Sequence, residues 1–250
     1  MNELFTSVAL FLAGASASFI NMMAGGGSLI TLGVMMLLGI DPSIANGTNR
    51  IGVLVGTGSG AWAFKSEKLS NLKESLILGG VAIPGALIGS WYSIQLSNVM
   101  FKKIIALVMI FVLITILIPK KKNTSVGNVN KRRKILIYPG MFIIGLYGGF
   151  IQVGVGFLLI ALIRNVLNLD LILTNMHKVF VVFIYTIPVL LIFGVNGKIN
   201  WFYAIVMSLG NALGSWISVK LAVKKGEKFV KLVLTIAILL MAIKFFLPDL

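Results

Sequence analysis

The sequence contains no cysteine, a single histidine and only seven acidic residues. Without cysteine, the chain cannot form disulfide bonds, thiolate metal sites or a cysteine nucleophile. One histidine and seven acids in 250 residues also leave little material for a catalytic metal centre. Charged residues make up 12% of the chain, against about 25% in a typical soluble domain. These absences argue against an ordinary soluble metalloenzyme, and we expect no cofactor and no bound metal.

Apolar side chains are what the sequence has in excess. Hydrophobic residues make up 58% of the chain, and the mean hydropathy is +1.01. One water-soluble core cannot bury so much apolar surface, and disordered or collagen-like chains have different compositions. We therefore predict an all-α polytopic membrane protein embedded in a lipid bilayer. We interpret the formal net charge of +15 as loop charge that sets orientation, so no nucleic acid partner is expected.

Ten apolar segments are expected along the chain. The first half contains 4–22, 26–40, 44–64, 74–95 and 101–118, and the second contains 135–150, 153–167, 172–194, 199–219 and 229–247. As helices, 26–40 and 153–167 would measure only about 22 Å, against a hydrocarbon core of about 30 Å. If each of these short segments is a re-entrant hairpin with its predecessor, the number of transmembrane helices is eight.

A basic stretch at 119–134 divides the chain into a first transmembrane repeat, 1–118, and a second, 135–250. With this loop in the cytoplasm, sixteen Lys and Arg residues lie on the cytoplasmic side and four on the outer side. Because cytoplasmic loops are enriched in Lys and Arg, this arrangement is favoured. We expect a multi-pass protein of the cell membrane, in a bacterial inner membrane. The first residues lack basic side chains, so we expect no cleaved signal peptide.

The two halves of the sequence align with each other. At an offset of 129 residues, Gly25 matches Gly154, Gly27 matches Gly156 and Asn46 matches Asn175, and Asp41, Asp170, Asn71 and Asn200 follow the same register. At an offset of 125, GALIGSW from Gly85 matches GNALGSW from Gly210. An odd number of segments in each half makes the two repeats inverted, which is a common plan for secondary transporters.

The motifs of both halves resemble one known family. The turn AGGGSLIT, then Ile40-Asp41-Pro42 and ANGTN, with the weaker copy GVGFLL, NLD and TNMHK, is similar to the TauE/SafE family of membrane transporters. The resemblance covers nearly the whole chain. It implies a transporter that exports sulfite, sulfonates or related organosulfur anions. The second copy departs from the first, because Phe157 stands in place of Ser28 and His177 in place of Thr48.

Glycine clusters that open the two short segments are the main candidate binding site. Glycine permits tight turns and close approach of the backbone to a ligand, and a helix N-terminus attracts anions. Close helix packing is the competing explanation, and we favour it for the GxxxG pairs Gly85/Gly89 and Gly210/Gly214. The expected substrate-binding residues are Gly25, Gly26, Gly27, Asn46, Asn49, Arg50, Gln152, Gly154, Gly156, Asn175, His177 and Lys178. No catalytic residue is expected.

Arg50 and Lys178 are cations inside apolar segments, where a charge needs a partner or a wet cavity. Each could bind the substrate anion, or its side chain could snorkel to the membrane surface. The amide side chains could bind the anion or join helices together. His177 could titrate near neutral pH or pack as a neutral side chain. Asp41 and Asp170 each precede a helix, so we expect both to cap helix N-termini.

The sequence favours a secondary transporter of small anions, not an enzyme, with a binding site near the middle of the membrane. Two alternatives stay open: an ion channel, and an intramembrane enzyme acting on a small or lipid substrate. GVNGKIN lacks the spacing of a phosphate-binding loop, so direct drive by ATP would require a partner. The expected partners are the small anion and the bilayer. Oligomeric state is open, with a homodimer as one option.

The charge bias generates a test of topology. Cysteines introduced at Asn123 and Asn98 of this cysteine-free chain should react with a membrane-impermeant thiol reagent from opposite sides of the membrane. Labelling of intact cells and inverted vesicles would measure this. Reaction of both cysteines from the same side would contradict the alternating arrangement.

Overall fold

The computed structural model describes residues 3–97, 99–100, 103–104 and 135–246. Within these residues the regular elements are all helices: α1 (Glu3–Met23), α2 (Ser28–Leu37), α3 (Pro42–Ser66), α4 (Leu72–Gln95), α7 (Ile137–Phe150), α8 (Val155–Leu167), α9 (Leu171–Val195) and α10 (Trp201–Phe246). The all-α prediction is confirmed, and each expected segment in the described part coincides with a helix. The expected segment 101–118, apart from 103–104, and the basic loop 119–134 lie outside the described residues.

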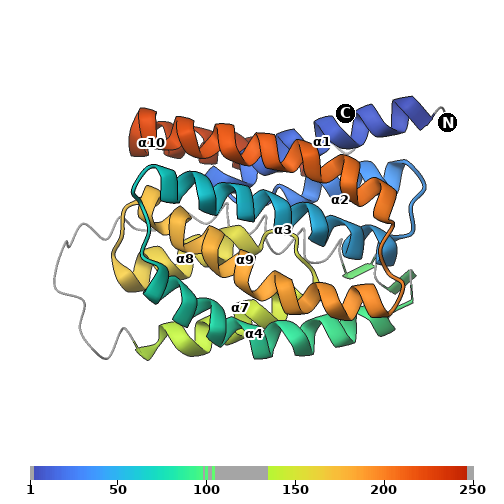
Figure 1. The fold of residues 1–250 in the computed structure, drawn as a ribbon, viewed down its shortest axis with the longest axis horizontal. Coiled ribbons are helices and arrows are strands. Elements are labelled where there is room, and N and C mark those ends of the chain that lie inside the picture. The colour runs from blue at the N-terminus through green and yellow to red at the C-terminus, as the bar shows by residue number, and fades with distance from the viewer. Residues whose placement is uncertain (1–2, 98, 101–102, 105–134, 247–250) are drawn as a thin grey trace.

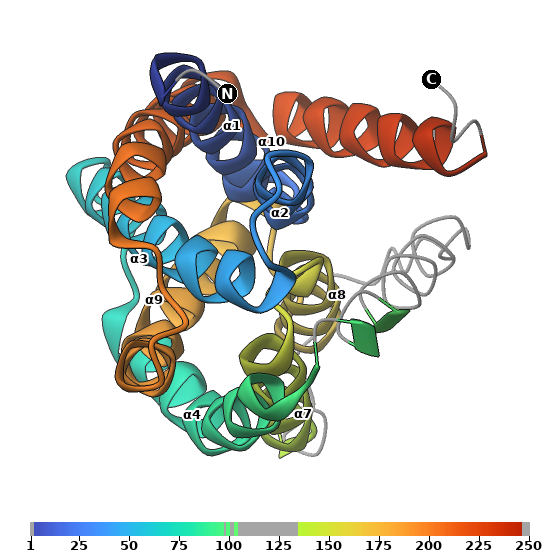
Figure 2. The ribbon, with the colours of Figure 1, turned by 90° about the vertical axis from the view of Figure 1, so that its right-hand side faces the viewer.

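The last two expected segments are joined in α10. Gly226 interrupts this helix with a left-handed backbone conformation, at φ 76° and ψ −175°. The two parts of α10 therefore run in different directions, and Figure 2 shows the C-terminal part extending away from the bundle. The break falls between the expected segments 199–219 and 229–247, as the sequence indicates.

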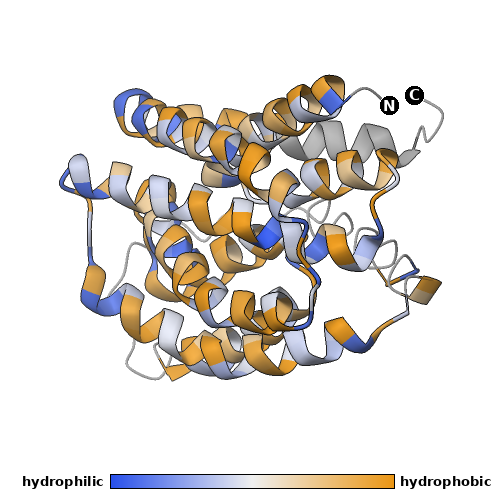
Figure 3. Ribbon diagram, turned by 45° about the vertical axis from the view of Figure 1, so that its right-hand side comes forward, coloured by the Kyte–Doolittle hydropathy of each residue, from blue (hydrophilic) through white to orange (hydrophobic). Residues whose placement is uncertain are grey.

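The surface of the bundle is that of a membrane protein. Four stretches are long and apolar enough to span a bilayer: α1, α4, α9 and residues Trp201–Val233 of α10. Large apolar side chains face outward on these helices, including Leu12, Trp91, Leu191 and Trp216. Figure 3 shows hydrophilic residues at the connecting loops and in the middle of the bundle, whereas the helices are mostly apolar. The chain is therefore a polytopic membrane protein with a partly polar interior.

The helices of the two halves pack in matching pairs. The α1–α10 contact has its counterpart in α7–α4, the α3–α10 contact in α9–α4, and the α1–α2 contact in α7–α8. Figure 2 shows α1, α2 and α10 on one side and α4, α7 and α8 on the other, with α3 and α9 between them. In Figure 1 the α2–α3 connection lies at the right end and the matching α8–α9 connection at the left. The halves are thus arranged as inverted repeats.

Glycine sets the closest helix contacts of this arrangement. A Cβ atom added to Gly85 or Gly89 of α4 would lie 2.1 or 2.0 Å from a backbone oxygen of α7. Gly210 and Gly214 of α10 approach α1 in the same way, at 2.1 and 2.0 Å from backbone oxygens. Small residues permit such approaches between membrane helices. The packing explanation of both GxxxG pairs is therefore confirmed.

The two ends of the bundle differ in charge. The end that holds the α3–α4 and α8–α9 connections carries Lys65, Lys68, Lys73 and Arg164. The opposite end carries Lys198 in the α9–α10 connection. Both predicted N-cap positions lie at helix starts, but only one cap forms. The Asp170 carboxylate accepts hydrogen bonds from Ile172 and Leu173 N–H, whereas the Asp41 side chain caps no N–H group, so that prediction was wrong.

The glycine contacts generate a prediction about stability. Gly89→Ala should destabilise the protein by about 1–3 kcal/mol, because the added methyl group overpacks the α4–α7 interface. Gly80→Ala is the matched control, because Gly80 lies on the same helix with open space where its Cβ would be. The control should be neutral or slightly stabilising. Thermal unfolding of the purified proteins in detergent would measure both, and equal melting temperatures would contradict the prediction.

Candidate functional site

Two glycine-led turns interrupt the bundle between α1 and α2 and between α7 and α8. Gly25 and Gly26 have left-handed backbones, with φ of 95° and 82°, and Gly154 has φ 73°. Gly27 is the N-cap of α2 and Gly154 is the N-cap of α8, and neither helix has a side-chain cap. The first N–H groups of a helix have no partner within the helix. Both short helices therefore begin with polar N–H groups inside the bundle.

The two turns touch each other. A Cβ atom added to Gly25 would lie 2.7 Å from the backbone of both Gly156 and Phe157, and one added to Gly156 would lie 2.6 Å from Gly25 Cα. The short segments thus meet through their first turns, as the predicted symmetry requires. Helix N-termini carry partial positive charge, so two such ends meet at this point. The two glycine turns are therefore closely packed, and the positive ends of α2 and α8 make the same place attractive to an anion.

Arg50 of α3 holds the end of the broken helix in the other half. Its side chain is fully buried. One terminal nitrogen donates to the carbonyl oxygen of Gly148 at 3.0 Å, and the other donates to that of Gly149 at 2.5 Å. The guanidinium also lies 4.6 Å from the ring centroid of Phe193. Arg50 therefore does not snorkel, and its partners are carbonyl groups at the C-terminus of α7.

Lys178 of α9 holds the C-terminal end of α1, the broken helix of the first half. Its ammonium group donates to the carbonyl oxygens of Asn21 and Met22, at 2.6 and 3.1 Å, where α1 ends. A third bond joins it to Asn175 Oδ1 at 2.6 Å. The side chain is 2% exposed, so it does not snorkel either. Each cation thus reaches across to the partial negative charge at the helix C-terminus of the opposite repeat.

The matched asparagines complete these two helix ends. Asn46 Nδ2 donates to the Phe150 carbonyl at 3.2 Å, and Asn175 Nδ2 donates to the Met23 carbonyl at 3.0 Å. Gln152 links Arg50 to Tyr185, because its Oε1 accepts from the arginine at 3.3 Å and its Nε2 lies 3.1 Å from the tyrosine hydroxyl. These amides therefore connect the broken helices to their neighbours.

Asn49 differs from the other amides. It is 1% exposed, and its Oδ1 accepts a hydrogen bond of 2.6 Å from the hydroxyl of Thr31 in the first turn of α2. Its Nδ2 has no hydrogen-bond partner among the described residues, and neither does the Nε of Arg50. A buried N–H donor without a partner is costly. Asn49 therefore presents an unused donor beside the N-terminus of α2.

The structure brings most of the expected site residues to the two turns and the helix ends beside them, and His177 is the exception. Its Nδ1 lies 2.9 Å from Ser75 Oγ of α4, so it contacts a different interface. Sequence reasoning missed Thr31 and Tyr185, which belong to the same polar interior. Hydroxyl groups in apolar helices carry no periodic signal, and only their placement beside Asn49 and Gln152 reveals them.

Comparison with known proteins gives consistent matches. A family model described as "Sulfite exporter TauE/SafE" matches residues 10–245. A probable membrane transporter protein, ORF9, of Sinorhizobium sp is 27% identical over 241 residues, covering 94% of this chain and 90% of that protein. A probable membrane transporter protein of Haemophilus influenzae is 25% identical, with coverage of 94% and 92%. YfcA of Escherichia coli, also named a probable membrane transporter protein, is 25% identical, with coverage of 94% and 87%. No solved structure matches.

The contacts of the two cations generate a prediction. Arg50→Met and Lys178→Met should each destabilise the protein strongly, because every buried carbonyl left without a donor costs about 1–3 kcal/mol. Arg164→Gln is the control, since it removes a half-exposed ion pair with Glu227, which is worth at most about 1 kcal/mol. Thermal unfolding in detergent measures the difference. A wild-type melting temperature in Arg50→Met would show that the helix ends do not depend on the cation.

Proposed function

We propose that this chain, which belongs to the sulfite exporter TauE/SafE family, is a secondary transporter that exports small oxyanions across the cell membrane. The family and the names of the relatives support a membrane transporter. The substrate, the direction of transport and the site are the proposal. Sulfite, sulfonates and related organosulfur anions are the proposed substrates, since the matching family is described as a sulfite exporter. The proposed location is a bacterial inner membrane with the central basic loop in the cytoplasm.

One observation carries the proposed anion site. The buried Asn49 Nδ2 has no partner among the described residues and lies beside the first turn of α2, because the Oδ1 of the same amide bonds to Thr31. The first N–H groups of α2, from Gly27 and Ser28, add donors and a positive helix end at the same place. An oxyanion would satisfy these donors together. The next residue, Arg50, also has an N–H group, at its Nε, without a partner among the described residues.

The chemistry of the site favours an anion over a cation. The groups that surround the two turns are N–H donors, amides and two cationic side chains, whereas the acids of the described chain lie toward helix ends. Cation channels and cation carriers usually place carboxylates within the membrane. Small oxyanions such as sulfite present several acceptor oxygens, which suits several N–H donors that converge.

The architecture offers a physical basis for alternating access. The α1–α2 and α7–α8 hairpins belong to opposite repeats, their outer ends lie at opposite ends of the bundle, and their tips touch at Gly25 and Gly156. A site between two such tips could open to either side if one repeat rocks against the other. In this scheme the glycine contact is the barrier that separates the two sides.

Asn49→Asp is the sharpest test of the site. The substitution keeps the oxygen that accepts from Thr31, but it removes the free donor and adds a negative charge. Loss of a hydrogen bond to a charged ligand should lower anion affinity by about 10- to 150-fold, and charge repulsion should lower it further. Thermal-shift titration of purified protein with sulfite, sulfate, thiosulfate, sulfonates and carboxylates would measure affinity, because a ligand that binds only the folded state raises apparent stability.

Asn196→Asp is the matched control, because it adds the same charge at an exposed position at the C-terminal end of α9. Its anion affinity should equal that of the wild type. Gly26→Val should also abolish binding, since a branched side chain disfavours the left-handed backbone that the turn requires. Unchanged affinity in folded Asn49→Asp protein would contradict the proposed site, and preference for a carboxylate would contradict the proposed substrate class.

A further inference from the structure

His177 is a buried titratable side chain that the proposed anion site does not use. Its side chain is 3% exposed, and its ring lies between α9 and the start of α4. Nδ1 lies 2.9 Å from Ser75 Oγ, and Nε2 lies 3.8 Å from Glu74 Oε2. Both ring nitrogens therefore face polar groups of the same neighbouring helix, one neutral and one acidic.

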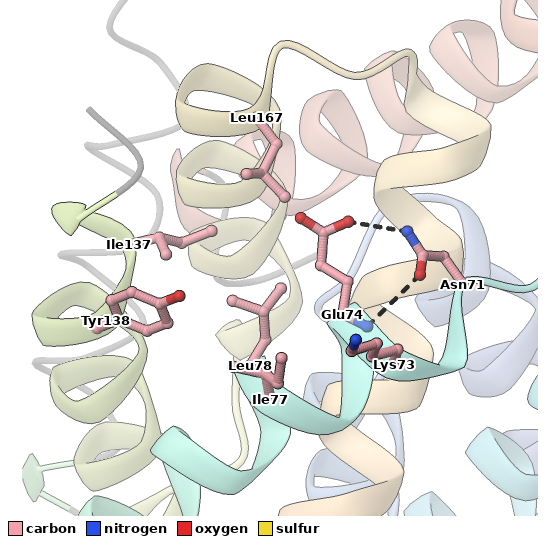
Figure 4. Close-up of a pocket in the computed structure, with 8 residues that line it drawn as sticks. All are labelled: Asn71, Lys73, Glu74, Ile77, Leu78, Ile137, Tyr138 and Leu167. Carbon is pink, nitrogen blue, oxygen red and sulfur yellow. Dashed lines mark hydrogen bonds between the residues drawn. The ribbon is translucent and has the colours of Figure 1, made fainter. Parts of the chain in front are cut away.

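Glu74 connects this histidine to a cavity. The cavity has a volume of about 300 Å³ and is lined by Asn71, Lys73, Glu74, Ile77, Leu78, Ile137, Tyr138 and Leu167. Figure 4 shows the Glu74 carboxylate extending among these residues and accepting a hydrogen bond of 2.9 Å from Asn71. The Glu74 side chain is 39% exposed. Water can therefore reach the carboxylate that faces the buried ring.

The first repeat provides an internal comparison. Thr48 matches His177 at the 129-residue offset, and Asn200 matches Asn71. The Thr48 hydroxyl accepts a hydrogen bond of 2.9 Å from the backbone N–H of Asn200, just before α10 begins. At that position one neutral hydrogen bond is enough to join α3 to the start of α10. At the matching interface, His177 of the second repeat and Glu74 of the first provide a titratable ring and a carboxylate, which is more than packing requires.

We propose that His177 and Glu74 form a proton-binding site that couples proton movement to anion transport. This inference rests on the proposed transport function. In the tautomer in which Nδ1–H donates to Ser75, the Nε2 lone pair faces Glu74 and can accept a proton that arrives through the cavity. The product is an imidazolium paired with a carboxylate, and no other bond is made or broken. Release of the proton by the same route restores the neutral ring.

The other charged groups near His177 have their own partners or face water. On α4, Lys73 lines the cavity together with Glu74. On α9, the adjacent Lys178 directs its ammonium group to the end of α1. Other charges at this end of the described bundle include Asp170, whose carboxylate caps the N-terminus of α9, and Lys65 and Lys68 near the C-terminus of α3. Glu67 is bonded to Lys220, and Arg164 to Glu227. Glu74 is therefore the charged group that titration of His177 would affect most directly.

The position of the pair explains how a proton could influence the anion. A proton on His177 adds positive charge one residue from the cation that holds the end of α1 beside the glycine turns. It also converts the contact between α9 and α4 into an ion pair with Glu74, whose carboxylate lines the cavity. Both effects change the free energy of the anion-bound state relative to the empty state. By linkage, the anion must then change proton affinity to the same extent.

The single histidine permits a direct measurement of proton binding. Protein labelled with ¹³C-histidine, purified without a histidine tag in lipid nanodiscs, should give one imidazole signal. The signal is recorded between about pH 5 and 8, and we expect it to change with pH and to respond to Glu74→Gln and to addition of methanesulfonate. A ring that stays in one protonation state over this whole range would overturn the proposal.

Proteoliposomes would measure the coupling. Methanesulfonate keeps a fixed charge over this pH range, so any proton movement that accompanies it belongs to the protein. With the membrane potential clamped and a pH dye inside the vesicles, wild-type transport should move protons together with the anion. His177→Gln and Glu74→Gln should lose the proton movement per transported anion. Thr48→Val, which removes the matching hydrogen bond of the first repeat, should keep the wild-type ratio.

The imidazole titration and the proteoliposome assay test different parts of the proposal. An unchanged proton-to-anion ratio in both variants would overturn the coupling role. If His177→Gln fails to fold, Glu74→Gln decides the question, because Glu74 is partly exposed and its loss leaves the ring in place. A wild-type protein that moves no methanesulfonate would contradict the proposed function instead, and the imidazole titration would then decide the proton site alone.

Discussion

The structure depends on how two helices end in the middle of the bundle. α1 and α7 stop where their last carbonyl oxygens have no following turn, and no bulk water reaches this depth of a membrane to hydrate them. Lys178 and Arg50 supply the missing donors, and each belongs to the other half of the chain. Neither half can therefore complete its own broken helix. The reciprocal exchange of cations fixes the two repeats against each other at the point where their tips touch.

The same exchange determines the charge of the interior. Each helix terminus carries about half an elementary charge, negative at the C-terminus and positive at the N-terminus. The negative C-termini of α1 and α7 offset part of the positive charge of Arg50 and Lys178. The positive N-termini of α2 and α8 add a similar amount of positive charge. The net charge near the tips is therefore positive. A bound anion with one or two negative charges would balance it, which is the electrostatic basis for the proposed substrate class.

The sequence predicted the helices well and the contacts of the site poorly. Hydropathy located the described helices to within a few residues, and the glycine matches identified both turns and both packing interfaces. The partners of Arg50 lay beyond such reasoning, because they are backbone carbonyls about 100 residues away that no side-chain pattern encodes. The sequence favoured either snorkelling or direct anion contact for this arginine, whereas its terminal nitrogens donate to backbone carbonyls. Arg50 and Lys178 also stand at different register positions, so only the structure reveals that they play equivalent roles.

The differences between the two repeats are as informative as their likeness. Lys178 matches Asn49 at the 129-residue offset, so one half places a cation where the other places an amide. In the second repeat this position is fully used in holding the end of α1. In the first, Arg50 holds the helix end from the next residue, and the Asn49 amide keeps an unpartnered donor. Thr48 and His177 also match at this offset and differ in chemistry. The Thr48 hydroxyl accepts one neutral hydrogen bond from Asn200, whereas the His177 ring can bind a proton. A symmetric scaffold needs the same contacts twice, so a polar group that one half has and the other lacks is available for binding chemistry. By this reasoning the proposed anion donor Asn49 lies in the first repeat and the proposed proton acceptor His177 in the second, and the broken helices that both repeats share are the proposed physical connection between them.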